Sequence, residues 1–431
     1  MKIISLFVLA FGFSSLAHAA GFEKAVLWSG KEAGSGSAGM SRISSSESLY
    51  FNPAGLAGGG TGGDFTLNVS PTSIKLQGSI ASAAVNEETD KNYSTIGSGF
   101  VKYKVNERLG VGVGAYVSGG SKAIYENVSL ASDQPTITAF TPTIRTELAI
   151  IEYSVGAAYE IIPGLRFGAA WRIAKVDGGF STVKKTIANT AYSFIDIADA
   201  KQTRYNGYRL GLQYENDAKT WGVGATFRNS MNFSAVGNGT GSTTVIPTTI
   251  TTATTIGKTT LGTGLPWSAS LGGNVLVNED FRLLAAVDMM KYSENKQLTI
   301  VGTINGTTVI PNLPLNWKDM YNYRLGGEYL GIETVVLKAG YVLTTPVTPT
   351  HDARATLAPP GTGHTVTLGA GKTFLRNTVS VDGAFEYAFN NAGGSASPTY
   401  ATDTTKELLA TSSSEYKAKV MALHLGASYR F

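Results

Sequence analysis

The C-terminal stretch MALHLGASYRF, residues 421–431, alternates between apolar and small or polar residues with a period of two. Successive side chains of a β-strand point to opposite faces, so a strand here has one apolar face and one polar face. An α-helix would mix the two classes of residue around its axis. The apolar face carries Met421, Leu423, Leu425, Ala427, Tyr429 and Phe431. The stretch therefore predicts a β-strand whose apolar face meets lipid.

The same alternation recurs along the chain from about residue 63, in stretches separated by turns rich in Gly, Asn or Thr. Residues 149–160 and 165–173 show it clearly, with their charged side chains confined to one face. We count fourteen stretches, and an even number returns both chain ends to the same side of a membrane. They begin near Gly63, Thr95, Gly110, Glu147, Gly164, Lys201, Lys219, Leu265, Phe281, Met320, Thr334, His364, Thr378 and Tyr416. The pattern predicts an all-β fold, a fourteen-stranded antiparallel transmembrane β-barrel.

The composition of the 431 residues favours a membrane barrel and argues against other classes of protein. Hydrophobic residues make up 43%, more than a disordered chain carries, and charged residues only 15%, well below the ~25% of soluble proteins. Beyond the leader, no run of about 20 apolar residues predicts a membrane helix. Lys and Arg are scattered singly, so the net charge of +4 predicts no nucleic-acid partner. With no Cys and four His, the sequence predicts neither a metal site nor a cofactor.

The first 19 residues have the features of a secretory signal peptide. Lys2 provides a positive charge, an apolar run follows, and Ala17-His18-Ala19 forms the small-residue pattern that a signal peptidase cleaves. We predict cleavage after Ala19; the alternative is that the run forms a buried N-terminal helix. Export combined with a barrel composition predicts the bacterial outer membrane, with lipid and lipopolysaccharide around the barrel.

Long and tight connections alternate along the predicted barrel. Tight ones, such as Pro163-Gly164 and Asn216-Asp217, are typical of periplasmic turns. The long segments are predicted to be extracellular loops and strand extensions, because barrels of this class carry their longer loops outside. They cover residues 121–145, 181–200, 237–264, 297–319, 344–363 and 391–415.

Residues 20–60 precede the first predicted strand and show no sustained alternation. They are rich in Gly and Ser, yet Phe22, Trp28 and Tyr50 distinguish them from a plain linker. A barrel this wide encloses space that its own side chains cannot fill. We predict that residues 20–60 form a hatch inside the lumen of a barrel made by residues 61–431. The alternative is a disordered periplasmic tail.

Two groups of motifs carry a resemblance to a known family. The first is Gly39-Met40-Ser41-Arg42, followed by Tyr50-Phe51-Asn52-Pro53-Ala54-Gly55-Leu56-Ala57. The second is Asn316-Trp317-Lys318-Asp319, Tyr323-Arg324-Leu325-Gly326-Gly327-Glu328-Tyr329, Leu337-Lys338-Ala339-Gly340-Tyr341 and Thr345-Pro346-Val347. They resemble the N-terminal hatch and the late strands of the FadL/TodX family of hydrophobic-compound transporters. The final Phe431 is similar to the C-terminal aromatic that outer-membrane proteins present to the barrel assembly machinery.

The resemblance implies a monomeric barrel, closed by the hatch, that carries long-chain fatty acids or related hydrophobic molecules across the outer membrane by ligand-gated passive diffusion. It also implies that ligand leaves through movement of the hatch and a sideways opening at a kinked strand. An aromatic-hydrocarbon uptake channel is the alternative within the family. An open porin and a structural or adhesive surface barrel are the alternatives of a different class.

Two sets of residues are candidates for the moving parts. Asn52, Pro53, Ala54 and Gly55 form the predicted hinge of the hatch, because Asn bonds local backbone and Pro fixes φ. Gly within a strand often marks a bend or a bulge. The candidates for the strand kink are Gly112, Gly114, Gly119 and Gly120. The alternative is that these glycines only pack against the hatch.

Charged residues on the inward faces are predicted to pair with one another or with the hatch, and a ligand carboxylate is an alternative partner for an Arg or Lys. They are Arg166, Arg172, Arg209, Arg228, Arg324, Glu152, Glu160, Glu328, Asp382 and Glu386. The sequence does not predict an enzyme. His424 and Ser428 share a face, but four residues of a strand separate them by about 13 Å, which is too far for a hydrogen bond.

Overall fold

The structure is a computed structural model of the 431-residue chain. It describes residues 22–26, 28–80, 82–89, 92–129, 141–185, 191–245, 250–304, 307–308, 313–393 and 415–431. The predicted signal peptide, residues 1–19, lies outside the described residues, as does most of the predicted loop 391–415.

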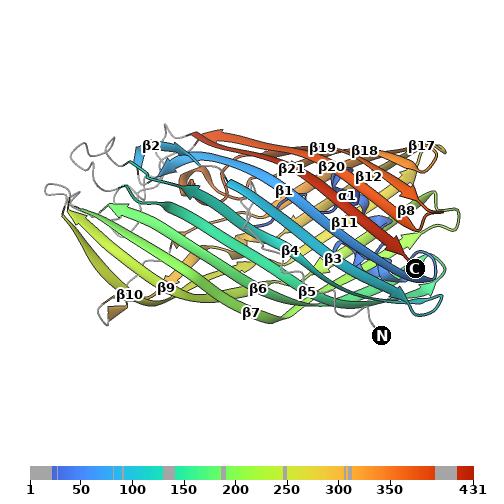
Figure 1. Cartoon of the computed structure of the whole chain (residues 1–431), viewed down its shortest axis with the longest axis horizontal. Helices are drawn as coiled ribbons and strands as arrows, with labels where there is room; N and C mark the ends of the chain where they lie inside the picture. Colours follow the sequence, from blue (N-terminus) through green and yellow to red (C-terminus); the bar gives the residue numbers. More distant parts are fainter. Residues whose placement is uncertain are drawn as a thin grey trace.

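The strands form one closed antiparallel barrel (Figure 1). The last strand, β21, pairs with the first, β1, from Asp64↔Arg430 to Gln77↔Lys417. Three positions around the wall are each filled by two strands in line, so the described residues make fourteen positions, as predicted. In order they are β1 (Gly62–Ile80), β3 (Asn92–Lys104), β4 (Leu109–Tyr125), β5 (Ile144–Ile162), β6 (Leu165–Lys185), β7 (Ala191–Glu215), β8 (Trp221–Arg228) with β9 (Met231–Val245), β11 (Ser268–Leu276) with β10 (Thr251–Leu265), β12 (Phe281–Met290) with β13 (Gln297–Val301), β17 (Met320–Ile332), β18 (Val335–Thr344), β19 (Gly363–Phe374), β20 (Val379–Gly393) and β21 (Glu415–Arg430).

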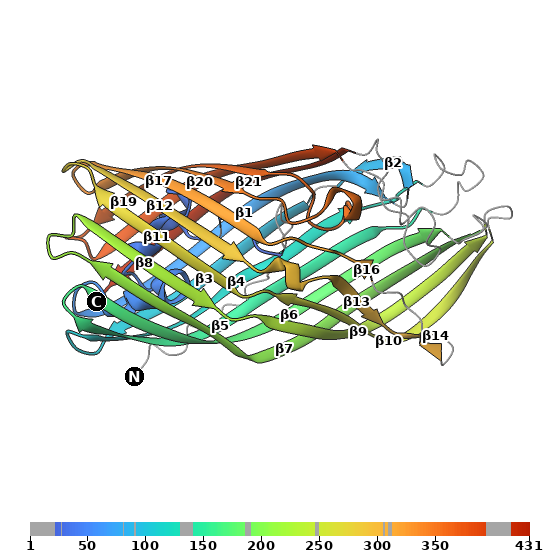
Figure 2. The same ribbon diagram turned by 180° about the vertical axis from the view of Figure 1, so that it is seen from behind.

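The two ends of the barrel differ in their connections. Short turns, such as residues 163–164 between β5 and β6, lie at the end that also holds the C-terminus (Figure 1, Figure 2). We call this the turn end and the opposite one the loop end; the sequence predicts that the turn end faces the periplasm. Several predicted long segments are largely strand extensions, since β9 and β10 together occupy most of residues 237–264. Minor strands are β2 (Ser82–Glu88), β14 (Thr303–Ile304), β15 (Thr307–Thr308) and β16 (Leu313–Pro314).

The wall separates apolar from polar side chains as the alternation predicts. In β21, Met421, Leu423 and Leu425 are 49%, 45% and 43% exposed on the outside, whereas His424 between them is fully buried. Large apolar residues such as Trp171 line the outer face of other strands in the same way. None of the helices in the described part of the chain is long and apolar enough to cross a membrane.

Residues 22–26 and 28–60, which we call the N-terminal segment, lie inside the barrel in its turn-end half (Figure 1, Figure 2). The helices are α1 (Gly30–Ala33), η2 (Gly39–Ser41), α2 (Ser48–Phe51) and η3 (Pro53–Ala57). Side-chain caps begin two of them: Ser29 Oγ accepts the N–H of Glu32 at 2.9 Å, and Asn52 Oδ1 accepts that of Ala54 at 3.2 Å. Helix α1 packs against β19, β20 and β21, whereas η3 packs against β3 to β7. The segment therefore touches widely separated parts of the wall.

The connection between β18 and β19 also turns into the lumen. Residues 345–361, which we call the inward loop, include η5 (Thr350–Asp352), and residues 352–360 are buried. Tyr125 at the end of β4 donates its hydroxyl to the carbonyl of Ala355 at 2.8 Å. The sequence analysis expects residues 344–363 to be an extracellular loop. The structure instead packs the loop inside, where its small apolar side chains, Leu357 among them, meet apolar wall residues.

Candidate functional site

Cationic side chains of the wall hold the backbone of the N-terminal segment. Arg324 Nη1 donates to the carbonyls of Ala25 and Gly36 at 2.7 and 2.8 Å, and Lys338 Nζ donates to that of Lys31 at 2.8 Å. Further wall donors to carbonyls of the segment are Lys102, Arg209 and Gln213. Because such hydrogen bonds are directional, they fix the segment in one position.

The charged residues that the sequence places on inward faces form ion pairs in most cases. Arg172 and Glu152 are fully buried and bidentate, with Nε–Oε2 and Nη2–Oε1 distances of 2.8 and 2.6 Å. Pairs that join the wall to the N-terminal segment are Arg228–Glu23, Glu386–Lys24 and Glu328–Arg42. Pairs within the wall are Arg324–Asp288, Arg166–Glu215 and Lys338–Asp382, while Glu160 accepts the N–H of Gly164. The partners Glu23, Lys24 and Arg42 belong to the segment and follow no strand pattern, so the alternation could not identify them.

The predicted hinge, residues 52–55, lies against the wall near the turn end. Asn52 is fully buried, and its Nδ2 donates to the carbonyls of Met40 and Leu212 at 3.1 and 3.0 Å. A Cβ on Gly211 of β7 would approach Asn52 Oδ1 to 2.1 Å, so this part of the wall accommodates the turn only with a glycine. Asn52 thus joins two parts of the N-terminal segment to the barrel. Its role as a hinge stays a prediction.

Strand β4 departs from a regular ladder at its predicted kink. Its pairing with β3 ends at Ser98↔Tyr116, and its register with β5 shifts between Val117 and Gly119. The N–H of Gly120 donates to the carbonyl of Phe22 at 2.8 Å, and a Cβ on Gly119 would approach the same oxygen to 2.5 Å. A Cβ on Gly112 would meet Leu56, and one on Gly114 would meet Phe100. Gly119 and Gly120 therefore lie at the irregular part of the strand and against the N-terminal segment, Gly112 packs against the segment, and Gly114 packs against the wall strand β3. The role of these glycines as a kink stays a prediction.

His424 has two buried partners that the sequence analysis missed. Its Nε2 lies 2.9 Å from Glu386 Oε2, and its Nδ1 lies 2.8 Å from Ser70 Oγ. Ser70 donates its hydroxyl to the carbonyl of Trp28 at 3.1 Å. Because the hydroxyl proton is engaged by a carbonyl and all three side chains are buried, the arrangement bridges the wall and the N-terminal segment rather than presenting a nucleophile.

The lumen of the loop-end half is lined by a large apolar cluster. Residues of the wall and the inward loop contribute to it together with Phe22 from the N-terminal segment. The Phe22 and Trp317 rings lie 5.1 Å apart, and the Trp317 and Tyr292 rings 5.5 Å apart. Other members include Leu148, Ile150, Phe180, Ile197, Met231, Phe233, Leu261, Ile300, Leu315, Met320 and Leu357. We call this set the apolar lumen cluster. The sequence analysis named no ligand-binding residues, because an inward apolar residue breaks the alternation that it relied on.

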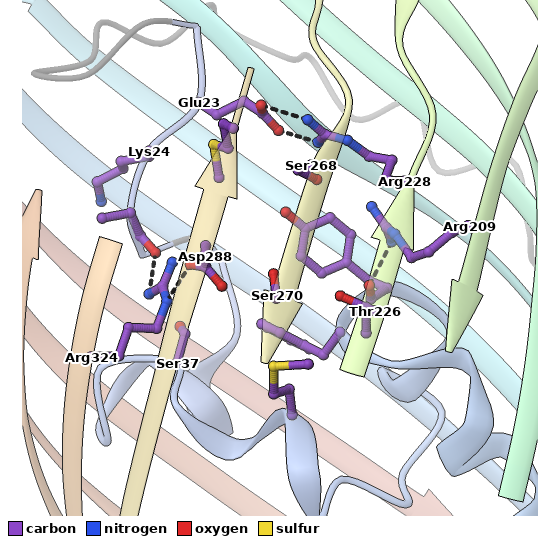
Figure 3. Close-up of a pocket in the computed structure, with 15 residues that line it drawn as sticks. Glu23, Lys24, Ser37, Arg209, Thr226, Arg228, Ser268, Ser270, Asp288 and Arg324 are labelled. Carbon is purple, nitrogen blue, oxygen red and sulfur yellow. Dashed lines mark hydrogen bonds and ion pairs between the residues drawn. The ribbon is translucent and has the colours of Figure 1, made fainter. Parts of the chain in front are cut away.

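A cavity of about 90 Å³, lined by both charged and apolar side chains, lies where the N-terminal segment faces β7, β8, β11, β12 and β17 (Figure 3). Glu23, Arg209, Arg228 and Arg324 line it together with Met290, which packs against the apolar lumen cluster. The cavity therefore lies at the junction of the charged and apolar parts of the lumen.

The N-terminal segment also buries carboxyl groups. Glu47 is fully buried and accepts a hydrogen bond from Asn68 Nδ2 at 3.1 Å, while its Oε2 has no hydrogen-bond partner. Burial raises the pKa of the Glu47 carboxyl to about 7, although a hydrogen bond with Ser29 acts in the opposite direction. The charge state of the segment therefore changes near neutral pH.

Sequence comparison identifies the family. Residues 10–431 match the family described as outer membrane protein transport protein (OMPP1/FadL/TodX). The chain belongs to this family. Members of the FadL/TodX family are outer-membrane β-barrel channels that transport hydrophobic compounds, and the family is not one of enzymes. No curated protein sequence matches the chain.

Solved structures of FadL/TodX proteins share the fold. A Pseudomonas aeruginosa FadL homologue is similar with a TM-score of 0.75 and 15% identity, covering 96% of this chain and all of its own. The P. putida toluene transporter TodX has a TM-score of 0.73 and 16% identity, and the Ralstonia pickettii toluene transporter TbuX 0.64 and 15%; each match covers 90% of this chain and 94% of the other. At these identities the likeness shows the barrel fold alone.

Proposed function

We propose that this FadL/TodX protein takes up long-chain fatty acids by ligand-gated passive diffusion. The observation that carries the proposal is the division of the lumen: an apolar lumen cluster in the loop-end half, and next to it, across Met290, a cavity with charged lining residues. A long-chain acid has an alkyl chain for the first and a carboxylate for the second. Keeping the alkyl chain out of water lowers its free energy by about 25 cal/mol per Å² of apolar surface.

Aromatic hydrocarbons are the second candidate substrate. The rings of Phe22, Trp317 and Tyr292 offer edge and face contacts to a small aromatic ligand. The printed names of TodX and TbuX as toluene transporters agree with this candidate without deciding it. A neutral hydrocarbon would leave the charged lining of the cavity unused.

We also propose the route by which ligand leaves. The N-terminal segment, whose residues are largely buried, occupies the turn-end half of the lumen. This argues against a straight path through the barrel and against an open porin. Between β3 and β4 the described backbone ladder stops at Ser98↔Tyr116, and beyond that pair Lys122 Nζ donates to the carbonyl of Tyr93 at 3.5 Å. We place the sideways opening beyond the end of this ladder. A disulfide that ties β3 to β4 above Ser98 should stop uptake while leaving the barrel folded; unchanged uptake would exclude this exit.

Equilibrium binding separates the candidate substrates. The purified full-length protein is titrated with oleate and with toluene, and each is then competed against the other. Tight oleate binding that toluene does not displace is expected. Binding of toluene alone would make the protein an aromatic-hydrocarbon channel, and binding of neither would return the surface-barrel alternative. Steady ion conductance in a planar bilayer would instead indicate an open porin.

A further inference from the structure

Exposed lysines lie on the outer face of the barrel where its last strand meets its first. The register pairs Lys75 of β1 with Lys419 of β21, and both side chains are exposed on the outside. The two strands lie side by side on the face of the barrel that Figure 1 presents. Like charges at opposed positions of adjacent strands destabilise a sheet. An anion that binds both lysines from outside the chain would offset this cost.

Carboxylates neutralise this part of the surface only in part. Lys75 Nζ lies 2.6 Å from Glu88 Oε1, but both side chains are more than half exposed, so solvent screens the pair. Among the residues that the structure describes, Lys419 forms no ion pair. The same holds for a third cation, Lys122 of β4, whose Nζ donates to the carbonyl of Tyr93 of β3 at 3.5 Å. We call the three lysines the outer lysine cluster; they outnumber the one carboxylate that pairs with them.

The outer lysine cluster lies at the loop-end boundary of the apolar outer face. Lys75 and Lys419 are each eleven residues along their strands from the pair Asp64↔Arg430 at the turn end. A strand crosses the hydrocarbon core of a bilayer in about 9–11 residues. Between the lysines and the turn end the outer face is apolar, and its exposed residues include Tyr387, Met421, Leu423, Leu425 and Val69. The lysines therefore lie level with the head groups of the leaflet at the loop end.

Aromatic side chains flank the lysines at the same level. Phe389 of β20 pairs with Lys419 in the register, and the ring of His364 stacks 5.3 Å from that of Phe389. On the other side, Tyr93 is 65% exposed and pairs with Ser73, two residues before Lys75. Aromatic girdles mark the head-group level of outer-membrane barrels. The surface thus places cations directly above an apolar face that acyl chains can cover.

The cations occupy two separate positions. Lys75 and Lys419 form one position, and Lys122 forms the other, with β3 lying between them. Clusters of lysines at the edge of a bilayer bind the phosphates of lipid head groups. A lipid with two phosphates at the opposite ends of a disaccharide, carried on several acyl chains, matches two cationic positions above an apolar face. A phospholipid with a single phosphate matches only one of them.

We propose that the outer lysine cluster binds lipid A, the phosphorylated glycolipid anchor of lipopolysaccharide. Lys75 and Lys419 bind one phosphate together through charge-assisted hydrogen bonds, and Lys122 binds the second. The acyl chains lie along the apolar residues of β20, β21 and β1. The bound lipid extends from the strand pair that closes the barrel to β4. The proposal goes beyond the proposed function, because it does not depend on which hydrophobic compound the channel carries.

Native mass spectrometry of the purified protein in detergent tests the site. The protein is titrated with lipid A and with the same lipid after removal of both phosphates, and the phosphorylated form should bind more tightly. Lys419→Gln should weaken binding of the phosphorylated form about fivefold, the effect of one lysine beside an anionic lipid. Adding Lys75→Gln should weaken it further. Binding of the dephosphorylated form should not change, which shows that the variants are folded.

The matched control is Lys175→Gln. Lys175 is exposed on the outer face of β6, ten residues from Leu165 at the turn end, but its register neighbours are Ile151 and Thr203 instead of a second cation. Its loss should leave the affinity for lipid A unchanged. An equal weakening in Lys175→Gln and Lys419→Gln would show a general effect of surface charge and overturn the site.

Two further results would also overturn the proposal. Equal binding of the phosphorylated and dephosphorylated lipids would show that acyl chains alone hold the lipid. Displacement of lipid A by an equal concentration of phosphatidylglycerol would show a surface for any anionic lipid. Oleate binding should stay at the wild-type level in all variants, so failure of the lipid site leaves the proposed function intact.

Discussion

The two halves of the lumen are filled by different kinds of contact. In the turn-end half, wall cations such as Arg324 and Lys338 bind particular carbonyls of the N-terminal segment. In the loop-end half, the wall, the inward loop and Phe22 form the apolar lumen cluster, beside hydrogen bonds such as that of Tyr125 with Ala355. Hydrogen bonds and ion pairs depend on direction, whereas apolar burial depends on area. The turn-end half is therefore suited to one defined closed state. The loop-end half is suited to replacing contacts among its own side chains with contacts to a ligand.

The largest effect is expected where a wall cation loses its side chain. Arg324→Met leaves the buried Asp288 without its partner and the carbonyls of Ala25 and Gly36 without their donor. Breaking a buried pair in this way costs about 3–5 kcal/mol. We expect residues 22–60 to become accessible to protease while the barrel stays folded. Digestion followed by mass spectrometry measures this.

Two variants control for the loss of Arg324. Adding Asp288→Leu removes the uncompensated carboxylate, so it should restore part of the protection against protease. The restoration should be incomplete, because the carbonyls of Ala25 and Gly36 still lack the Arg324 donor. Arg145→Met breaks ion pairs whose arginine is 25% exposed, and it should change protection little. Equal protection in Arg324→Met and the wild type would mean that the ion pairs do not hold the segment.

A second effect concerns pH. The carboxyl of Glu47 has a pKa of about 7 in the docked segment, against 4.5 ordinarily, because burial disfavours its charged form. Docking therefore takes up a proton, and its free energy weakens as pH rises from about 4.5 to 7, by about 3 kcal/mol in total. We expect the protection of amides in residues 22–60, measured relative to the intrinsic exchange rate at each pH, to fall over this range. Glu47→Gln, which stays neutral, should flatten the dependence; an equally steep profile in that variant would assign it to another group.

The strand positions follow from the sequence because lipid outside and polar contacts inside impose a period of two. The pattern of residues 421–431 is reproduced in the burial of β21, and all fourteen wall positions correspond to predicted stretches. The path of the N-terminal segment does not follow from such a pattern. Its position depends on pairs such as Glu23–Arg228, which are 205 residues apart and are matched only by the folded barrel. Local alternation carries no information about such pairs.

The inward loop is a second region whose position could not be predicted from the sequence pattern. Connections longer than the periplasmic turns are expected outside the barrel, and residues 345–361 meet that description by length. Their small and apolar side chains nevertheless fit the lumen, where Tyr125 donates to Ala355. His424 is a further example, since its partners Ser70 and Glu386 come from β1 and β20, the two strands on either side of β21. The spacing along the strand excluded Ser428 as a hydrogen-bond partner of His424. It could not identify Ser70, which is far away in the sequence.

A smaller loss is expected at the predicted hinge. Asn52→Ala removes one donor to the carbonyls of Met40 and Leu212, although Gln213 still donates to that of Met40, and it removes the side-chain acceptor of the Ala54 N–H at the start of η3. Losing such a helix cap costs about 0.5–2 kcal/mol. We expect faster hydrogen exchange in residues 52–57 and a changed uptake rate. If neither stability nor transport changes, Asn52 is not a hinge.

The β4 contact should respond to a single added methyl group. In Gly119→Ala the Cβ approaches the Phe22 carbonyl to 2.5 Å, so Phe22 must shift, at a cost of about 1–3 kcal/mol. We expect faster exchange at Gly120 and weaker protection of Phe22. Gly327→Ala is the matched control, because nothing lies within 4 Å of its added Cβ. The same response in both variants would show that the effect does not come from contact with Phe22.

The smallest effect is expected in the apolar lumen cluster. Ile300→Val removes one methyl group from a side chain that is 1% exposed, and such changes cost about 0.5–1.5 kcal/mol. In the free protein this destabilises the loop-end packing. If a ligand occupies the space of these contacts, part of the loss disappears on binding, because the ligand's own methylenes fill the gap left by the side chain. The binding free energy of oleate, measured by titration, should therefore become weaker by less than the free energy of unfolding does. Protease protection of residues 22–60 should not change. An altered protection would show that the two halves are coupled through packing, and the contrast between a directional half and an adaptable half would then be wrong.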